Sequence, residues 1–357
     1  MAAALKVLER TRPLWHDGTA TRMLGCTLCH NEPDCGGLNI AAPAFSCHDF
    51  CTCNDKAACN FVCPSRTSSY VRYLKEIGGS FDLDPVPRGA TVPVVKLPNA
   101  LPMIYGRASR TERLRASWAC VPLARLFSRR TGEAKFRTRE ELAQAFLIDP
   151  DAHLIISGVD VDLSLERYWR LGRSGNLLEV LASLKPDLVT TPNFSLFVNA
   201  PREDNLHNMK RIAICWHELN AAGIPTALHV NARTDRDWKR WARFISDRPE
   251  ITAIAFEFAT GPKYPERGTW HVDHLCRLRE DVGRDLQLVI RGARYAGVLR
   301  RCYHQVTLID TSLYVKTMRR QKLVSEGHIQ RWERTFTLTD EPLDQVMQRN
   351  LDAGIQV

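Results

Sequence analysis

Eight of the twelve cysteines are crowded into one stretch of the chain, where they could hold metal ions. Thiolates at short spacings are the ligands of structural zinc and of iron–sulfur clusters. The spacing fits neither a simple zinc ribbon nor a ferredoxin motif, so we expect structural zinc, with an iron–sulfur cluster as the alternative. Because the segment has few apolar residues, the bound metal would supply much of its folding free energy. The eight are Cys26, Cys29, Cys35, Cys47, Cys51, Cys53, Cys59 and Cys63.

The other four cysteines, Cys120, Cys215, Cys276 and Cys302, lie far apart in apolar surroundings. The first ten residues carry charges every few positions and lack the apolar core of a signal peptide. This pattern favours a cytoplasmic location, where disulfides are disfavoured. We therefore expect these four cysteines to pack as small core residues.

A second set of reactive side chains follows short apolar runs farther along the chain. It combines acids with an imidazole, amides and a guanidinium, which together suit acid–base chemistry or attack by a carboxylate. Each also has a structural alternative: Asp162 as a helix cap, His229 as a core histidine, and Arg291 as the partner of Glu257. The set is Asn99, Asp160, Asp162, Asn193, His229, Asn231, Glu257, Arg291 and Asp310.

The runs that precede these side chains are β-branched and short, as in strands, and amphipathic stretches separate them. Their starts are about 30 residues apart, the length of one strand and one crossover helix. The stretches predicted to be helical include 205–222, 234–247, 271–282 and 293–302, the second opening on a Thr-x-x-Asp cap. The predicted strands are Pro93–Leu97, Ala119–Leu123, His153–Gly158, Asp187–Thr191, Pro225–Val230, Thr252–Glu257, Gln287–Arg291 and Val306–Asp310.

Eight strands, each followed by a helix, predict an α/β fold of the (β/α)8 type, a TIM barrel. A doubly wound sheet is disfavoured, because no Gly-rich nucleotide-binding motif of the GxGxxG or GxxxxGK[ST] type occurs. In a barrel the carboxyl ends of the strands meet on one face, so the polar set above would share one pocket. We expect a Cys-rich module over 1–90, the barrel over 91–335 and a C-terminal tail or helix over 336–357.

Composition places the chain among ordinary folded proteins, with 44% hydrophobic and 25% charged residues. It excludes a disordered tail and a collagen-like repeat. No apolar run approaches the ~20 residues of a membrane span, so no membrane partner is expected.

The last predicted strand carries a resemblance to a known family. Leu308–Lys316, reading LIDTSLYVK, resembles the nucleophile segment of tRNA-guanine transglycosylases, particularly the archaeal type. Val189–Asn193 and Val289–Arg294 are similar to the family's segments at strands four and seven, and the likeness covers roughly residues 150–320. Relatives of that family act on DNA, including deazaguanine DNA transglycosylases and a glycosylase branch of anti-phage defence. The resemblance implies a TIM barrel that breaks N-glycosidic bonds, with Asp310 as the nucleophile and Tyr314 near the substrate.

Departures from the family pattern point away from guanine. Asn193 stands where the family has a base-reading aspartate, strand three ends in Gly158–Asp162 instead of Asp-Ser-Gly, and the family's zinc site after the nucleophile strand is missing. We therefore expect a DNA glycosylase that removes a modified base from phage DNA, leaving an abasic site. A hypermodified cytosine, for instance a glucosylated hydroxymethyl form, is one target. Asp160 or Glu257 would be the second acid, and the expected contacts to base or phosphate are Asn193, His229, Asn231, Arg291, Asp162 and Phe194.

Two other functions stay open at this stage. One is a transglycosylase that inserts a 7-deazaguanine into DNA or, less favoured, tRNA. The other is a metal-stabilised nucleic-acid-binding protein whose barrel has no activity. The acids at the strand ends argue against the second. The sequence leaves the oligomeric state open.

A nucleic-acid partner is favoured by the charge. The chain carries 49 Lys and Arg against 40 Asp and Glu, a net charge of +9, with dense basic blocks in 107–139 and 300–334. Such blocks can bind phosphates, although a solvated basic face is the alternative. A base flipped into the pocket could stack on Tyr105, Tyr168, Trp169 or Phe194. The cations expected to bind nucleic acid are Arg107, Arg110, Arg129, Arg130, Lys316, Arg319, Arg320 and Lys322.

Overall fold

The computed structural model describes residues 74–354, except for 174, 198–201, 260–264, 327–328 and 339, together with two short strands nearer the N-terminus. These strands, β1 (Thr21–Arg22) and β2 (Asn39–Ile40), pair antiparallel. The eight clustered cysteines lie outside the described residues, so the metal-binding module stays a prediction. Within the described part no group of three or more His, Cys, Asp or Glu side chains is arranged to hold a metal ion.

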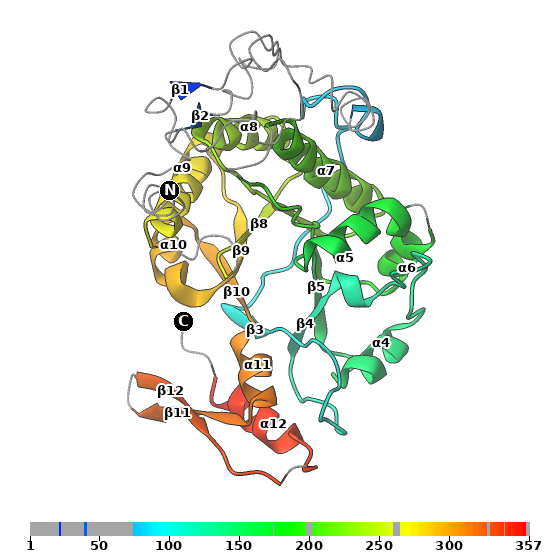
Figure 1. The fold of residues 1–357 in the computed structure, drawn as a ribbon, viewed down its shortest axis with the longest axis vertical. Helices are drawn as coiled ribbons and strands as arrows, with labels where there is room; N and C mark the ends of the chain where they lie inside the picture. The colour runs from blue at the N-terminus through cyan, green and yellow to red at the C-terminus, as the bar shows by residue number, and fades with distance from the viewer. Residues whose placement is uncertain are drawn as a thin grey trace, which may run out of the picture.

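Eight parallel strands form one sheet that closes into a barrel (Figure 1). The order around the sheet is β3-β10-β9-β8-β7-β6-β5-β4. A parallel bridge between Met103 and Cys120, with the Ile104 amide donating to the Cys120 carbonyl at 2.7 Å, joins the two outermost strands. The expected α/β barrel is therefore confirmed. The strands are β3 (Ala100–Pro102), β4 (Trp118–Pro122), β5 (His153–Ser157), β6 (Leu188–Thr190), β7 (Thr226–His229), β8 (Ala253–Glu257), β9 (Gln287–Arg291) and β10 (Gln305–Asp310).

The first strand is the one predicted at the wrong place. Residues 93–97 form no strand and lie before β3. Side chains of the last strands bond the carbonyls of this run instead: Gln287 Nε2 lies 3.3 Å from the Val94 and Val95 oxygens, and Gln305 Nε2 lies 2.6 Å from that of Leu97. The run therefore closes the amino-terminal end of the barrel.

Helices cover the barrel, and α8 shows why they form where they do. Thr234 caps its first turn and Asp237 bonds back to the Thr234 amide, the capping box expected from the sequence. Trp238, Trp241 and Ile245 are buried on one face of α8. The helices are α4 (Arg139–Phe146), α5 (Asp162–Arg167), α6 (Leu177–Ser183), α7 (Arg202–Ala221), α8 (Asp235–Ser246), α9 (Pro265–Val282), α10 (Ala296–Cys302), α11 (Ser312–Met318) and α12 (Asp344–Asp352), with a π-helical turn η5 (Tyr168–Gly172) and 3-10 turns η4 (Leu123–Arg125) and η6 (Ala293–Tyr295).

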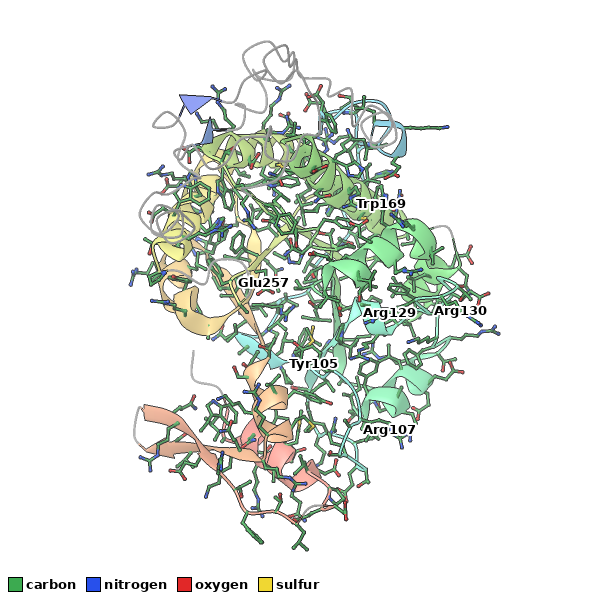
Figure 2. The ribbon with its side chains drawn as sticks, viewed as in Figure 1. Tyr105, Arg107, Arg129, Arg130, Trp169 and Glu257 are labelled. Atoms are coloured by element: carbon green, nitrogen blue, oxygen red, sulfur yellow. A yellow bond between two sulfur atoms is a disulfide. The ribbon has the colours of Figure 1, made fainter. Side chains whose placement is uncertain are left out.

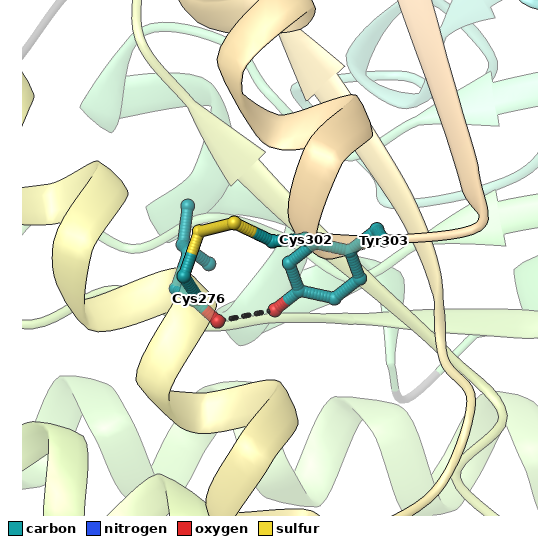
Figure 3. The surroundings of a disulfide bond; sticks show 4 residues. Cys276, Cys302 and Tyr303 are labelled. Carbon is teal, nitrogen blue, oxygen red and sulfur yellow. Dashed lines mark hydrogen bonds between the residues drawn. A yellow bond between two sulfur atoms is a disulfide. The ribbon is translucent and has the colours of Figure 1, made fainter.

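The core has an inner part within the barrel and a larger outer part between strands and helices. Large aliphatic side chains such as Leu101, Met103 and Ile155 alternate with small ones such as Ala227 and Ala255 in the inner part. Cys120 lies in the inner part and Cys215 in the outer part, both as free, buried thiols, as expected. Cys276 and Cys302 differ from the expectation, because they form a disulfide between α9 and α10 (Figure 3).

Described residues on both sides of the barrel strands are packed, and the predicted domain bounds stay a prediction. Ile77, Phe81, Leu83 and Val86 belong to the outer core, so the described end of the 1–90 segment packs on the barrel. At the other end, β11 (Gln321–Glu326) and β12 (Ile329–Arg334) form an antiparallel hairpin. With α12 it makes a C-terminal lobe (321–352) below the tip of β3 in Figure 1.

The side chain of the α12 residue Asn350 joins that helix to the hairpin: its Nδ2 donates to the Gln321 carbonyl, and its Oδ1 accepts from the Leu323 amide. Asp344, at the start of α12, accepts from the Thr111 amide at 2.9 Å and so ties the lobe to the β3–β4 loop. No helix in the described ranges is long and apolar enough to cross a bilayer.

Candidate active site

A narrow recess, closed too tightly in this structure to hold a bound molecule, lies among the carboxyl ends of the barrel strands and is called the pocket below. Its polar lining comes from four strands: Ser157 of β5, Thr190 of β6, His229 of β7 and Arg291 of β9. Val159, Ala255, Phe256, Val289, Ile290 and Ile309 complete the lining. The strand ends thus bring His229 and Arg291 together, as the sequence predicts. Ser157 and Thr190 were missed, although each is a polar residue that closes an apolar run.

His229 is an uncharged hydrogen-bond acceptor in this pocket. Burial lowers its pKa to about 3, and the nearby Arg291 lowers it further, while a hydrogen bond to the backbone of Thr191 opposes the shift. Nδ1 lies 2.7 Å from the Thr191 carbonyl oxygen, which can only accept, so Nδ1 carries the proton. Nε2 bonds no described residue and keeps its lone pair for a ligand.

Arg291 is held in place by a buried ion pair. Its Nε lies 3.3 Å from Oε2 of Glu257, whose side chain is only 4% exposed. Glu257 also accepts from the Ala259 amide, and Arg291 donates to the Val159 carbonyl at 3.4 Å and to the Tyr105 hydroxyl at 3.3 Å. The guanidinium is therefore fixed at the pocket, where it can stabilise negative charge.

Tyr105 and Asp160 adjoin residues that line the pocket: the Tyr105 hydroxyl accepts from Arg291, and Asp160 follows Val159 in the chain. Burial raises the pKa of Tyr105; Arg291 opposes the shift, and the negative charges of Glu257 and Asp160 add to it. Both carboxylates are therefore close enough to act on the phenol. Asp160 is half-buried, and its Oδ1 accepts from the Val161 amide at 2.8 Å. No other hydrogen bond to its carboxylate comes from the described residues, which leaves Asp160 the most available acid at the mouth.

Asp310, the nucleophile that the family resemblance implies, accepts hydrogen bonds from the backbone at the start of α11. It caps helix α11: Oδ1 accepts from the Ser312 amide at 2.8 Å and Oδ2 from the Leu313 amide at 2.9 Å. Its neighbour Ile309 lines the pocket, and successive strand residues point to opposite sides. Burial raises the pKa of Asp310, while its three hydrogen bonds to Ser312 and Leu313 lower it. The structure thus gives this carboxylate a capping function.

The amides form a second layer beside the pocket. Asn231 Nδ2 donates to the Asn193 side chain at 3.2 Å and to the Phe194 carbonyl at 3.1 Å. Arg233, which sequence reasoning missed, donates to Asn231 Oδ1 at 3.3 Å and to the Leu196 carbonyl at 2.6 Å. A basic residue in the loop just beyond Asn231 was the available signal.

Most of the aromatic residues expected to stack on a base are in the core. Phe194 and Tyr168 are 1% exposed and Trp169 is 6% exposed. Tyr105 remains at the mouth, packed edge-on against Tyr314 with ring centroids 5.5 Å apart. Tyr105 is thus the least buried of these four rings.

The expected phosphate-binding cations divide into two groups. Arg107, Arg129 and Arg130 are exposed and lie on one side of the molecule, with Tyr105 and Glu257 nearer its centre (Figure 2). Arg319 and Lys322 are exposed and Lys316 is half-buried. Arg110 and Arg320 are engaged internally and do not offer free cations.

The guanidinium of Arg110 is buried and bonds the Phe146 and Leu147 carbonyls. Arg320 bonds the side chain of Thr337 and the carbonyl of Leu338. Lys135 adds to the exposed group: burial lowers its pKa, and Arg125 and Arg129 lower it further, so three cations gather there.

The arrangement joins an available carboxylate, a fixed guanidinium and a neutral imidazole at one pocket, beside a basic surface. Such a site can stabilise separated positive and negative charge on a polyanionic substrate. Asp162, by contrast, is exposed and accepts from the Ser195 hydroxyl at 2.6 Å, which ties two loops together.

Comparison of the sequence with models of known protein families and with curated proteins finds no match.

Proposed function

We propose that this chain is a DNA glycosylase that removes a modified base, such as a hypermodified cytosine of phage DNA, and leaves an abasic site. The observation that carries the proposal is the pocket at the barrel mouth. Arg291 and His229 line this pocket, and Asp160 directly follows the lining residue Val159 in the chain. These are the groups that N-glycosidic cleavage in a polyanion requires.

The reaction separates charge in a way that matches the two fixed ionic groups. As the bond between C1′ and the base nitrogen breaks, its electron pair leaves with the base and C1′ becomes cationic. Asp160 is the carboxylate available to stabilise C1′, and Arg291 faces the pocket where the departing base would carry negative charge. Water then adds to C1′, and its proton neutralises the released base.

Glu257 acts through Arg291. The ion pair of 3.3 Å and the hydrogen bonds of Arg291 to Val159 and Tyr105 fix the guanidinium before substrate arrives. A preorganised cation needs no reorientation during the reaction, which is the main source of electrostatic catalysis. We therefore treat Glu257 as a positioning residue.

Recognition of the base would come from the acceptors in and beside the pocket. The lone pair on Nε2 of His229 can accept from an exocyclic amino group, such as that of a cytosine. Asn193 and Asn231 are hydrogen-bonded to each other, and their side-chain amides offer both hydrogen-bond donors and acceptors to the base. Because the pocket is small and lies among strand ends, the base must leave the helical stack to reach it.

Asp160 is assigned the role that the family resemblance gives to Asp310. Both oxygens of Asp310 already accept hydrogen bonds from the backbone of α11. Asp160 has one such bond, through Oδ1, among the described residues. A carboxylate that is free of other partners can approach the sugar without uncapping a helix.

The test is base release. The full chain is incubated with phage DNA that contains glucosylated hydroxymethylcytosine and with unmodified DNA, and released bases and abasic sites are measured by mass spectrometry. Release from the modified DNA alone is expected, and Asp160→Asn should abolish it. Asp151→Asn is the matched control, because this exposed acid precedes the amino end of the same strand. Failure to release any base from either DNA would remove the proposal, and incorporation of an added 7-deazaguanine would point to base exchange.

A further inference from the structure

Three large apolar side chains are exposed at the barrel mouth, in the connection from β5 to α5, in the first turn of α5 and in the segment after β6. Val161 and Leu163, where β5 leads into α5, are each 63% exposed, and Phe197, after β6, is 48% exposed. The hydrogen bond of 2.6 Å from Ser195 to Asp162 holds the start of α5 and the segment after β6 together. Apolar side chains grouped on a surface in this way mark a contact with another molecule.

Free cations follow on the same element. Arg167 is four residues beyond Leu163 in α5, a spacing that puts two side chains on one helix face. Arg170 lies in the next turn, η5, and both arginines are exposed. Neither makes an ion pair or side-chain hydrogen bond within the described part of the chain, whereas the neighbouring Glu166 pairs with Arg211 at 2.8 Å.

We propose that Val161, Leu163 and Phe197 form a wedge that enters the base stack of duplex DNA as the target nucleotide leaves it. Arg167 and Arg170 would bind the flanking phosphates. Apolar wedges of this kind, backed by arginine, are how proteins open a base step. The inference rests on the proposed function and adds the means by which the duplex is opened. The net charge of +9 and the free arginines favour a polyanion over a protein as the partner of this surface.

The wedge is rigidly connected to the pocket. Val159, two residues before Val161, lines the pocket. The Gly158 amide donates to Thr190 Oγ1 at 2.9 Å, and the Asn193 amide donates to the Gly158 carbonyl at 3.0 Å. A Cβ on Gly158 would lie 2.2 Å from the Thr191 carbonyl oxygen, so only glycine lets the ends of β5 and β6 approach this closely. Entry of a base into the pocket and filling of the gap would therefore occur together.

The experiment measures binding by fluorescence anisotropy with the full chain and two labelled 30-base-pair duplexes. One is intact, and the other carries a tetrahydrofuran abasic analogue opposite 2-aminopurine, so that its gap is already open. We expect the wild type to prefer the gapped duplex and to change the 2-aminopurine fluorescence. Leu163→Ala combined with Phe197→Ala should reduce that preference by roughly tenfold and abolish the fluorescence change, since stacking contacts have about that value. Val298→Ala, an exposed valine on α10, is the matched control.

Two results would overturn the wedge. One is that the wild type and the double variant each bind the intact and the gapped duplex with equal affinity. The other is light scattering that shows wild-type dimers and a monomeric double variant, which would make the patch a subunit contact. Base release from single-stranded modified DNA separates this proposal from the proposed function, because a single strand needs no wedge. The double variant should release base from the single strand as fast as the wild type does. If the wild type itself releases no base from the single strand, the proposed glycosylase function is contradicted, and the binding measurement alone decides on the wedge.

Discussion

Replacing Asp160 and Asp310 separately tests which of the two carboxylates serves the proposed reaction. Asp310→Ala removes two capping hydrogen bonds, of 2.8 and 2.9 Å, and should lower the free energy of unfolding by about 1–2 kcal/mol. Asp310→Asn keeps one acceptor and has no charge to bury. It should therefore stay within about 1 kcal/mol of the wild type and retain base release. Asp160→Asn loses no cap, and should unfold like the wild type while base release falls by roughly three orders of magnitude.

The pH dependence adds a second readout for Asp310. Burial raises the pKa of this carboxyl above its ordinary value, so the folded protein holds the proton more tightly than the unfolded chain does. Ionisation of Asp310 therefore costs stability as the pH rises from about 4 through the folded pKa. Asp310→Asn has no such loss, so its stability relative to the wild type should improve over that interval. Urea unfolding followed by tryptophan fluorescence at several pH values measures this difference.

One combination of results would refute the assignment. If Asp310→Asn folds normally but releases no base, while Asp160→Asn remains active, the nucleophile is on β10, as the family resemblance implies. Release is measured by mass spectrometry on the same DNA for both variants. Asp151→Asn again controls for the loss of one negative charge.

Four further predictions concern the ion pair, the histidine, the surface and the metal. Glu257→Gln should cost about 3–5 kcal/mol of stability by leaving Arg291 buried without its counter-charge, and adding Arg291→Met should restore part of it; urea unfolding of the single and double variants tests this coupling. Because the pKa of His229 is about 3 when folded against about 6.5 when unfolded, it should weaken the fold as the pH falls below about 6.5, and His229→Gln should flatten that part of the stability–pH curve. Arg129→Glu with Arg130→Glu should weaken DNA binding and reduce the slope of log affinity against log salt by about one for each phosphate that the variant no longer binds; an unchanged slope would mark a merely solvated face. Zinc, or else iron, should be found by elemental analysis, and chelation should lower stability and solubility before it affects base release.

The sequence predicted elements best where a local pattern has only one physical interpretation. Strand β9 has the predicted bounds, and the Thr234–Asp237 capping box begins α8 where expected. The strand predicted at 93–97 was placed too early: that run is apolar like a strand, but the pairing with β10 begins at Ala100. Cys276 and Cys302 are on different helices, so their pairing depends on a tertiary contact that spacing does not reveal.

The site was predicted in its composition but not in its geometry. A strand-end aspartate is equally suited to cap the next helix or to face the pocket, and the side chain's direction depends on the strand register. Asp310 and Asp160 therefore looked alike in the sequence and differ in the structure. Apolar periodicity likewise cannot separate an aromatic ring at the mouth, such as Tyr105, from one in the core, such as Phe194. The wedge residues were missed because an exposed valine or leucine has no sequence signature.

The pairing of β3 with β10 has a consequence for synthesis of the chain. β3 is the first barrel strand to leave the ribosome and β10 the last, so one edge of β3 has no partner until about 200 more residues are made. At typical rates of 5–20 residues per second this takes roughly 10 to 40 s. An open strand edge invites pairing with other nascent chains, and short strands that contain proline resist it. β3 is three residues long and ends in Pro102, with Pro98 just before it, so the edge that stays open longest is also poorly suited to aggregate.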